Sequence, residues 1–214
     1  MQAWMNNYKT YLTNKKFLLN VLLSFCFIIV GLIVNFYSGL YATEKASNSV
    51  TDLILSNTRV RDVDSIFIYS SFILWIIVIT ICLIDPKKIP FTAKSIALFI
   101  LIRSVFISVT HIGPFPDQLI VNPLSLLNYF SFGGDLFFSG HTGLPFLLCL
   151  IYWNNKILKI FFLLSSLFFG SIVLLAHLHY TIDVLAAFFI TYTIFKISEL
   201  LFKKDFTLLN KGLL

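Results

Sequence analysis

The chain alternates between long apolar runs and short polar stretches, and the apolar runs indicate its fold class. A helix that crosses a bilayer needs ~20 mainly apolar residues, and six runs reach or approach this length. The runs lack the alternation of membrane barrel strands, so lipid leaves helices as the way to pair their backbone polar groups. We therefore predict an all-α bundle of six transmembrane helices, over residues 17–37, 65–84, 93–112, 139–153, 157–178 and 181–202.

The first and the fourth runs differ from the others. The first follows Lys9, Lys15 and Lys16, as a signal peptide would, but it is longer than a signal core and no cleavage site follows it, so we interpret it as a retained helix. The fourth is short, and we expect it to begin inside the polar mouth of the bundle. Little chain lies outside the six runs, which predicts a single membrane domain over residues 1–214.

Composition supports a membrane protein and excludes a water-soluble globule. Apolar residues make up 58% of the chain and charged residues 12%, and the mean hydropathy is +0.89. A soluble domain of this length needs more polar surface than that.

Basic residues are distributed unevenly between the two ends of the predicted bundle. If six helices alternate, Lys45, Arg59 and Arg61 fall on one side and twelve lysines fall on the other. The positive-inside rule then predicts that the lysine-rich side and both termini are cytoplasmic. The net charge of +6 is then explained by topology and by contact with anionic lipids, and we expect no nucleic-acid partner. The twelve lysines are Lys9, Lys15, Lys16, Lys87, Lys88, Lys94, Lys156, Lys159, Lys196, Lys203, Lys204 and Lys211.

In this orientation two polar segments, residues 134–142 and 179–183, emerge on the extracytoplasmic face. They contain His141, His179 and Asp183, which are suited to proton transfer or nucleophilic attack. We therefore predict an active site on that face. The remaining histidines, His111 and His177, we expect to be solvated or structural.

His179 and Asp183 are four residues apart at the predicted start of the last transmembrane helix. This spacing puts both on one face, where the carboxylate can accept a hydrogen bond from one imidazole nitrogen. The other nitrogen is then free to act as a base or as a nucleophile, with its tautomer fixed.

The tetrapeptide Ser139-Gly140-His141-Thr142 opens the fourth predicted helix. Ser139 can cap the helix, Gly140 lets a ligand approach the backbone, and the free N–H groups of the first turn favour an anion such as phosphate. His141 is placed there to protonate a leaving oxygen as a general acid. Asp135 is either a residue that precedes the helix or a partner for a headgroup or for His141.

Arg103 lies inside the third predicted helix. A charge within the bilayer is costly and usually functional, although a long side chain can also snorkel to the interface. We expect Arg103 to bind phosphate. Two histidines and a carboxylate could instead hold a metal, but phosphoryl transfer uses the same residues without further ligands, so we predict no metal and no cofactor.

Together these motifs resemble the sphingomyelin synthase family, a branch of the type 2 phosphatidic acid phosphatase superfamily. The similar positions lie within about residues 93–195 and comprise Gly134-Asp135, the Ser139–Thr142 segment, the segment from His179 through Tyr180 to Asp183, and Arg103 with Thr110, Pro114 and Pro116. Two features depart from the family: Gly133 stands where the family often has Cys, and Asp62 and Asp64 match its acidic motif only loosely.

The resemblance implies a double displacement on a phospholipid donor with a lipid acceptor such as ceramide. His179 attacks the phosphodiester, Asp183 orients His179, and His141 protonates the departing diacylglycerol and then deprotonates the acceptor. The resemblance also implies that Ser139, Gly140, Thr142 and Tyr180 belong to the substrate site with Arg103 and Asp135.

Two other functions stay open at this point. A lipid phosphate phosphatase of the same superfamily usually has a Pro after the matching Arg and a Ser-Arg pair before the nucleophile, where this chain has Ser104 and Ile172-Val173. A small transporter would place polar groups at the midplane on several helices, and here Arg103 alone does so. The headgroup, the acceptor, the cellular membrane and the oligomeric state are not predicted.

Overall fold

The computed structural model describes residues 2–118 and 134–212, with side chains from residue 8 onward, and its regular structure in these ranges is entirely helical. The all-α prediction is therefore confirmed for the described residues. The helices are α1 (Gln2–Thr13), α2 (Lys15–Lys45), α3 (Asp64–Ile84), α4 (Ile89–Val109), α5 (Gly140–Ile151), α6 (Lys156–Leu175), α7 (Thr181–Leu201) and α8 (Lys203–Lys211), with short 3-10 turns η1 (Leu55–Asn57) and η2 (Pro86–Lys88).

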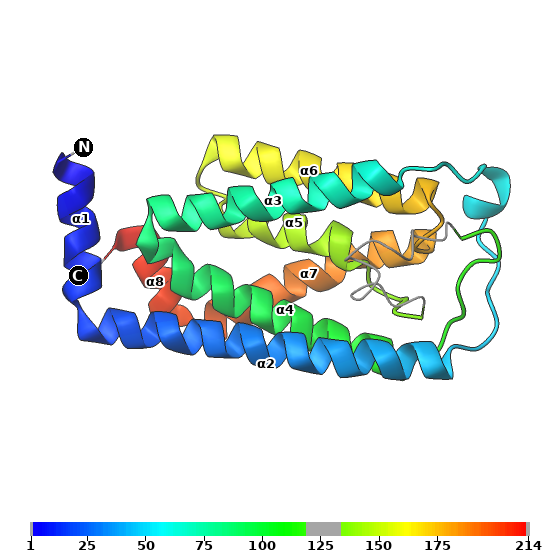
Figure 1. Ribbon diagram of the computed structural model, residues 1–214, viewed down its shortest axis with the longest axis horizontal. Helices are drawn as coiled ribbons and strands as arrows, with labels where there is room; N and C mark the ends of the chain where they lie inside the picture. Colours follow the sequence, from blue (N-terminus) through cyan, green and yellow to red (C-terminus); the bar gives the residue numbers. More distant parts are fainter. Residues whose placement is uncertain (1, 119–133, 213–214) are drawn as a thin grey trace.

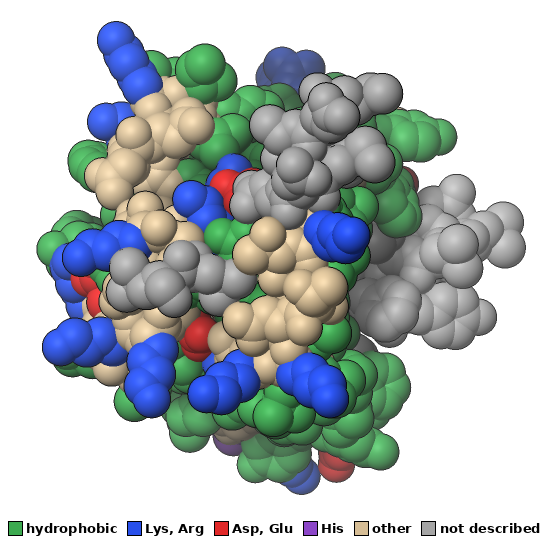
Figure 2. All heavy atoms as spheres, turned by 90° about the vertical axis from the view of Figure 1, so that its left-hand side faces the viewer, with side chains coloured by type: hydrophobic (Ala, Val, Ile, Leu, Met, Phe, Trp, Pro, Cys, Tyr) green, Lys and Arg blue, Asp and Glu red, His purple; other side chains and the backbone are tan. Residues whose placement is uncertain are grey.

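Helices α2 to α7 run in alternating directions along one long bundle, as Figure 1 shows. Both termini lie at the same end, together with α1 and α8. Basic side chains gather over this end, which faces the viewer in Figure 2. The predicted orientation assumed that the helices alternate in direction and that basic residues gather at one end, and the structure has both features. Which side of a membrane this end faces stays a prediction.

Five helical segments are long and apolar enough to cross a membrane: Lys15–Lys45, Asp64–Ile84, Pro86–Val109, Lys156–Leu175 and Thr181–Leu201. The predicted span at residues 139–153 is represented by α5, which has 12 residues. At ~1.5 Å per residue such a helix is about 18 Å long, well short of a hydrocarbon core of ~30 Å. The six-span prediction is therefore not confirmed.

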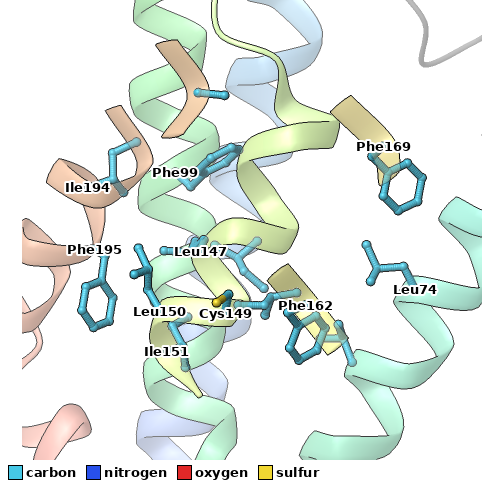
Figure 3. Packing of buried hydrophobic residues seen from close by; sticks show 14 of the residues in the cluster. Leu74, Phe99, Leu147, Cys149, Leu150, Ile151, Phe162, Phe169, Ile194 and Phe195 are labelled. Atoms are coloured by element: carbon cyan, nitrogen blue, oxygen red, sulfur yellow. The ribbon is translucent and has the colours of Figure 1, made fainter. Parts of the chain in front are cut away.

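Helix α5 is short but lies at the centre of the bundle, against α4, α6 and α7 (Figure 3). Its residues Leu147 to Ile151 are all buried, and Phe99, Phe162 and Ile194 pack around them. Gly143 permits this close packing: a Cβ atom there would lie 2.8 Å from the Phe99 ring and 2.7 Å from Thr191 Oγ1. The buried helix holds its own N-terminus in a fixed place, and that N-terminus carries the predicted site residues.

The outer faces of α2 and α3 are apolar and exposed. Leu22 is 59% exposed and Ile76 is 63% exposed. Large apolar side chains on a bundle surface have no favourable solvent except lipid. This surface supports an integral membrane protein.

A partly buried polar network ties α2, α4 and α8 together at the lysine-rich end. Lys94 Nζ lies 2.7 Å from Asp205 Oδ2 and donates to Asn20 Oδ1 at 2.6 Å. Asn20 Nδ2 completes the network by donating to Asp205 Oδ1 at 2.6 Å. Both charged groups of the network have a partner, so the network stabilises the packing of these three helices. Lys94 is also one of the lysines that gather at this end.

Cysteine labelling tests the orientation. We expect a cysteine at the exposed Pro116, in a protein whose three native cysteines are replaced, to react with a membrane-impermeant thiol reagent added outside intact cells. The exposed Lys204 lies at the opposite end of the bundle, so a cysteine there should react only after the membrane is broken. The reverse pattern would invert the topology. Asn122, a second reporter position on the same predicted face as Pro116, lies outside the described residues.

Candidate functional site

His179 and Asp183 form a buried pair at the start of α7. His179 Nδ1 lies 3.1 Å from Asp183 Oδ2, and the same oxygen accepts the backbone N–H of Tyr180 at 3.0 Å. His179 is 4% exposed and Asp183 is fully buried. The contact assigns the proton to Nδ1, since a carboxylate can only accept, and so leaves Nε2 as the free basic nitrogen.

Ser139 caps α5, as predicted. Its Oγ accepts the backbone N–H of Thr142 at 3.4 Å and the Thr142 hydroxyl at 3.2 Å. Both side chains are fully buried, and the Thr142 carbonyl accepts the Ser166 hydroxyl at 2.7 Å. These contacts give the two hydroxyls a role in fixing the N-terminus of α5.

His141 is the second residue of α5 and is exposed. Its ring lies 4.5 Å from the Phe67 ring of α3 and 6.5 Å from the Phe169 ring of α6, measured between centroids. A histidine that is both held by neighbouring rings and accessible can exchange protons with a bound molecule.

Arg103 is buried near the site end of α4, and the loop before α5 wraps around it. Its Nε donates to the carbonyl of Phe138 at 3.1 Å, and its Nη2 donates to both the carbonyl and Oδ2 of Asp135 at 3.0 Å. Phe137 and Phe138 adopt positive φ angles of 74° and 72°, which are unfavourable for bulky residues. This strained loop directs its carbonyl groups toward the guanidinium. Asp135 precedes α5 and pairs with Arg103, a partner that was not considered from the sequence.

The three segments converge at one end of the bundle. The Ser139 N–H donates to the carbonyl of Asp183 at 3.1 Å, which joins the start of α5 to α7. A Cβ at Gly140 would lie 3.1 Å from Arg103 Nε, so the glycine lets the guanidinium approach the first turn of α5. His141 is within electrostatic range of both His179 and Arg103. The arrangement places two histidines and a guanidinium around the N-terminus of a helix.

Tyr180 faces away from this cluster in the described structure. Its ring is 1% exposed, its hydroxyl donates to the carbonyl of Gly113 at 2.8 Å, and the hydroxyl oxygen accepts the N–H of Val50 at 3.1 Å. These contacts join two loops to the start of α7, and within the described residues they direct the Tyr180 hydroxyl to the loops and not to His141 or Arg103.

The other two histidines lie outside the cluster. His177 is 2% exposed, has a positive φ of 53°, and its Nε2 lies 3.3 Å from Thr58 Oγ1. His111 Nε2 lies 3.0 Å from the carbonyl of Ser108. The predicted span 157–178 included His177, and the predicted span 93–112 included His111. In the structure both histidines follow their helices, because α6 ends at Leu175 and α4 ends at Val109.

Asp52, in the segment between α2 and α3, was not singled out from the sequence. Its Oδ2 accepts the backbone N–H of Thr181 at 2.7 Å, and its Oδ1 accepts the Thr181 hydroxyl at 2.9 Å. Asp62, which was compared with the acidic motif of the family, is exposed and accepts a hydrogen bond from the N–H of Asp64 at 3.3 Å. The sequence indicates a distant partner for Asp52 only weakly, because an Asp before a turn commonly accepts hydrogen bonds from the backbone that follows it. Asp52 also makes such local contacts here, with the N–H groups of Ile54 and Leu55.

Metal ligands do not gather in the part of the chain that the structure describes: no three His, Cys, Asp or Glu side chains there are arranged to hold an ion.

Comparison with known proteins yields one match. No curated protein and no solved structure matches the chain significantly. Residues 133–200 match the family described as PAP2 superfamily C-terminal. This range contains His141, His179 and Asp183 but not Arg103. Over this range the chain is similar to the type 2 phosphatidic acid phosphatase superfamily, whose members are generally phosphatases or phosphotransferases.

Proposed function

We propose that this protein is a membrane-embedded lipid phosphotransferase that moves a phosphorylated headgroup from a glycerophospholipid to the hydroxyl of a second lipid, such as ceramide. The observation that carries the proposal is the His179–Asp183 pair, joined by the Ser139–Asp183 contact to the helix start that presents His141.

The first step is attack of His179 Nε2 on the donor phosphorus. A P–N bond forms, the bond from phosphorus to the diacylglycerol oxygen breaks, and protonated His141 gives its proton to that oxygen. The Asp183 carboxylate accepts the hydrogen bond from Nδ1 and stabilises the positive imidazole that develops.

The second step reverses these roles. Neutral His141 takes the proton of the acceptor hydroxyl, the acceptor oxygen attacks the phosphohistidine, and the P–N bond breaks to restore His179. The N–H groups of the first turn of α5 and the Arg103 guanidinium stabilise the phosphate oxygens in both steps.

The charge around Arg103 supports a phosphodiester donor. A phosphomonoester carries nearly two negative charges at neutral pH, and a diester carries one. Arg103 is partly neutralised by Asp135, 3.0 Å away, so the site holds less positive charge than a dianion requires.

A lipid phosphate phosphatase is the second candidate, with water as the acceptor. The observation in its favour is that the Arg61 N–H donates to the carbonyl of Leu175 at 2.9 Å, which brings the segment with Arg59 and Arg61 beside the turn that precedes His179. Two more cations there would suit a dianionic phosphate.

Product analysis distinguishes the two functions. Purified protein is incubated with labelled phosphatidylcholine, phosphatidylethanolamine or phosphatidic acid, with and without ceramide. We expect the label of an intact phospholipid to appear on ceramide or diacylglycerol, and we expect no transfer with His179→Ala, which controls for contaminating enzymes. Rapid release of inorganic phosphate from phosphatidic acid without any lipid acceptor would replace the transferase assignment by the phosphatase one.

A further inference from the structure

The segment between α2 and α3, residues 47–63, lies along the turn that carries His179. Its backbone or side chains contact that turn at four points, from Leu175 to Thr181. The contacts are Arg61 N to Leu175 O at 2.9 Å, Thr58 Oγ1 to His177 Nε2 at 3.3 Å, Val50 N to Tyr180 Oη at 3.1 Å, and Asp52 to Thr181.

Asp52 makes the strongest of these contacts. Thr181 is the first residue of α7, so its N–H has no partner within the helix, and Asp52 Oδ2 supplies one at 2.7 Å from more than a hundred residues away. Asp52 Oδ1 also accepts from the Thr181 hydroxyl, Ile54 N and Leu55 N. A carboxylate at this place also complements the positive end of the helix dipole.

The hydrogen bonds keep Asp52 ionised. Burial raises the pKa of its carboxyl, but the bonds from Thr181, Leu55 and Ile54 lower it by more, so the pKa lies below its ordinary value. The group therefore accepts hydrogen bonds with both oxygens at neutral pH.

The anchored residue is next to the catalytic pair. Thr181 is two residues from His179 and two from Asp183, and the intervening Tyr180 N–H is bound to the same Asp183 oxygen as His179 Nδ1. Tyr180 is itself held by Val50 and Gly113 through its hydroxyl. A displacement of Thr181 would therefore change the direction of the His179 ring.

We propose that Asp52 is a positioning residue that, from the loop between α2 and α3, fixes the start of α7 so that His179 Nε2 points at the phosphorus. This inference rests on the proposed chemistry of His179. Asp52 touches no reacting atom in this scheme, and it acts by holding Thr181 in place.

The loop after α4 is held by the same segment through a different contact. Gly113 N donates to Asn48 O at 3.1 Å, and a Cβ at Gly113 would lie 2.2 Å from Ser47 O. Only glycine fits so close to another backbone. The segment 47–63 thus links the loop after α4 to the start of α7, and Asp52 is its only carboxylate bound to Thr181 in the described structure.

Four variants test the proposal. Asp52→Asn replaces one acceptor oxygen by a donor, Thr181→Val removes only the hydroxyl contact, Thr181→Ser keeps both contacts, and Asp62→Asn is a matched change in the same segment at an exposed acid. A misplacement of ~1 Å can lower turnover by ~100-fold. We expect kcat to fall by about 100-fold for Asp52→Asn and by about 10-fold for Thr181→Val, with KM within about threefold of wild type and with the other two variants close to wild type.

Two measurements separate positioning from general loss of structure. Rates are measured on whichever product the wild type forms, transferred headgroup or free phosphate, so that failure of the substrate assignment leaves this test intact. Modification of His179 by diethyl pyrocarbonate, located by mass spectrometry, needs no turnover at all. We expect slow modification in the wild type, where the ring is 4% exposed, and several-fold faster modification in Asp52→Asn.

The outcomes decide the proposal. A lower kcat with faster His179 modification supports it, and so does faster modification alone if the wild type proves inactive. If His179 were modified at the wild-type rate in both Asp52→Asn and Thr181→Val, the proposal would be overturned. Equal losses in Asp52→Asn and Asp62→Asn would also overturn it, because the segment would then act without a specific contribution from Asp52.

Discussion

Replacement of His179 by Ala is expected to abolish turnover and to remove any acid-labile phosphorylated form of the protein. The substitution removes the only imidazole whose Nδ1 is held by a buried carboxylate within the described residues. No neighbouring group can take over the attack with the same geometry, so we expect a loss of at least about 10⁴-fold, as for other covalent catalysts. The measurements are the rate of product formation and the trapping of phosphoenzyme from a labelled phospholipid.

His177→Ala is the matched control, because this residue is equally buried and lies two positions away. Its Nε2 contacts Thr58 Oγ1 and its ring lies 5.2 Å from the Phe115 ring. Its loss costs one contact of the segment 47–63, so we expect turnover to stay within about tenfold of wild type. If His177→Ala were inactive and His179→Ala active, the nucleophile would be His177 and the role given to the Asp183 pair would be wrong.

The local parts of the site could be predicted because they depend on short spacing. The separation of four residues predicted that Asp183 can reach His179, and the two side chains do meet. The reason differs in part from the prediction, because α7 begins at Thr181 and His179 therefore precedes the helix. A Ser followed by a helix favours capping, and Ser139 does cap α5. The apolar runs likewise predicted helices, since lipid-facing segments have no other way to pair their backbone.

The parts that depend on tertiary packing could not be predicted. Asp52 and Tyr180 find their partners more than sixty residues away, and nothing in the local sequence encodes such contacts. The predicted fourth span, residues 139–153, exceeds α5 by Ser139, which caps the helix, and by Tyr152 and Trp153. The loop that precedes α5 was not predicted to enclose Arg103, because it is stabilised by hydrogen bonds to the guanidinium rather than by apolar character. Hydropathy alone does not indicate whether an apolar run faces lipid or, like α5, is surrounded by other helices and shorter than a membrane span.

Replacement of Arg103 is expected to have the second largest effect. Lys keeps the charge but loses the planar donors that now bind Phe138 and Asp135, so Arg103→Lys should lower headgroup transfer by about 10-fold, and Arg103→Ala by about 100-fold or more. The measurement is transfer from intact phospholipid, with thermal unfolding recorded beside it, because Arg103→Ala also leaves Asp135 without its partner. If Arg103→Ala were folded and fully active, another group would bind the phosphate.

Asp135→Asn gives the reciprocal test of the phosphodiester assignment. It removes the negative charge 3.0 Å from Arg103 Nη2 while keeping the backbone carbonyl contact at the same residue. The guanidinium then has more positive charge to offer, which favours a dianionic monoester over a monoanionic diester. We expect the ratio of phosphatidic acid hydrolysis to headgroup transfer to rise by about 10-fold, a difference of about 1.4 kcal/mol in transition-state stabilisation. An unchanged ratio would mean that the Arg103–Asp135 pair holds the loop before α5 and does not select the charge of the substrate.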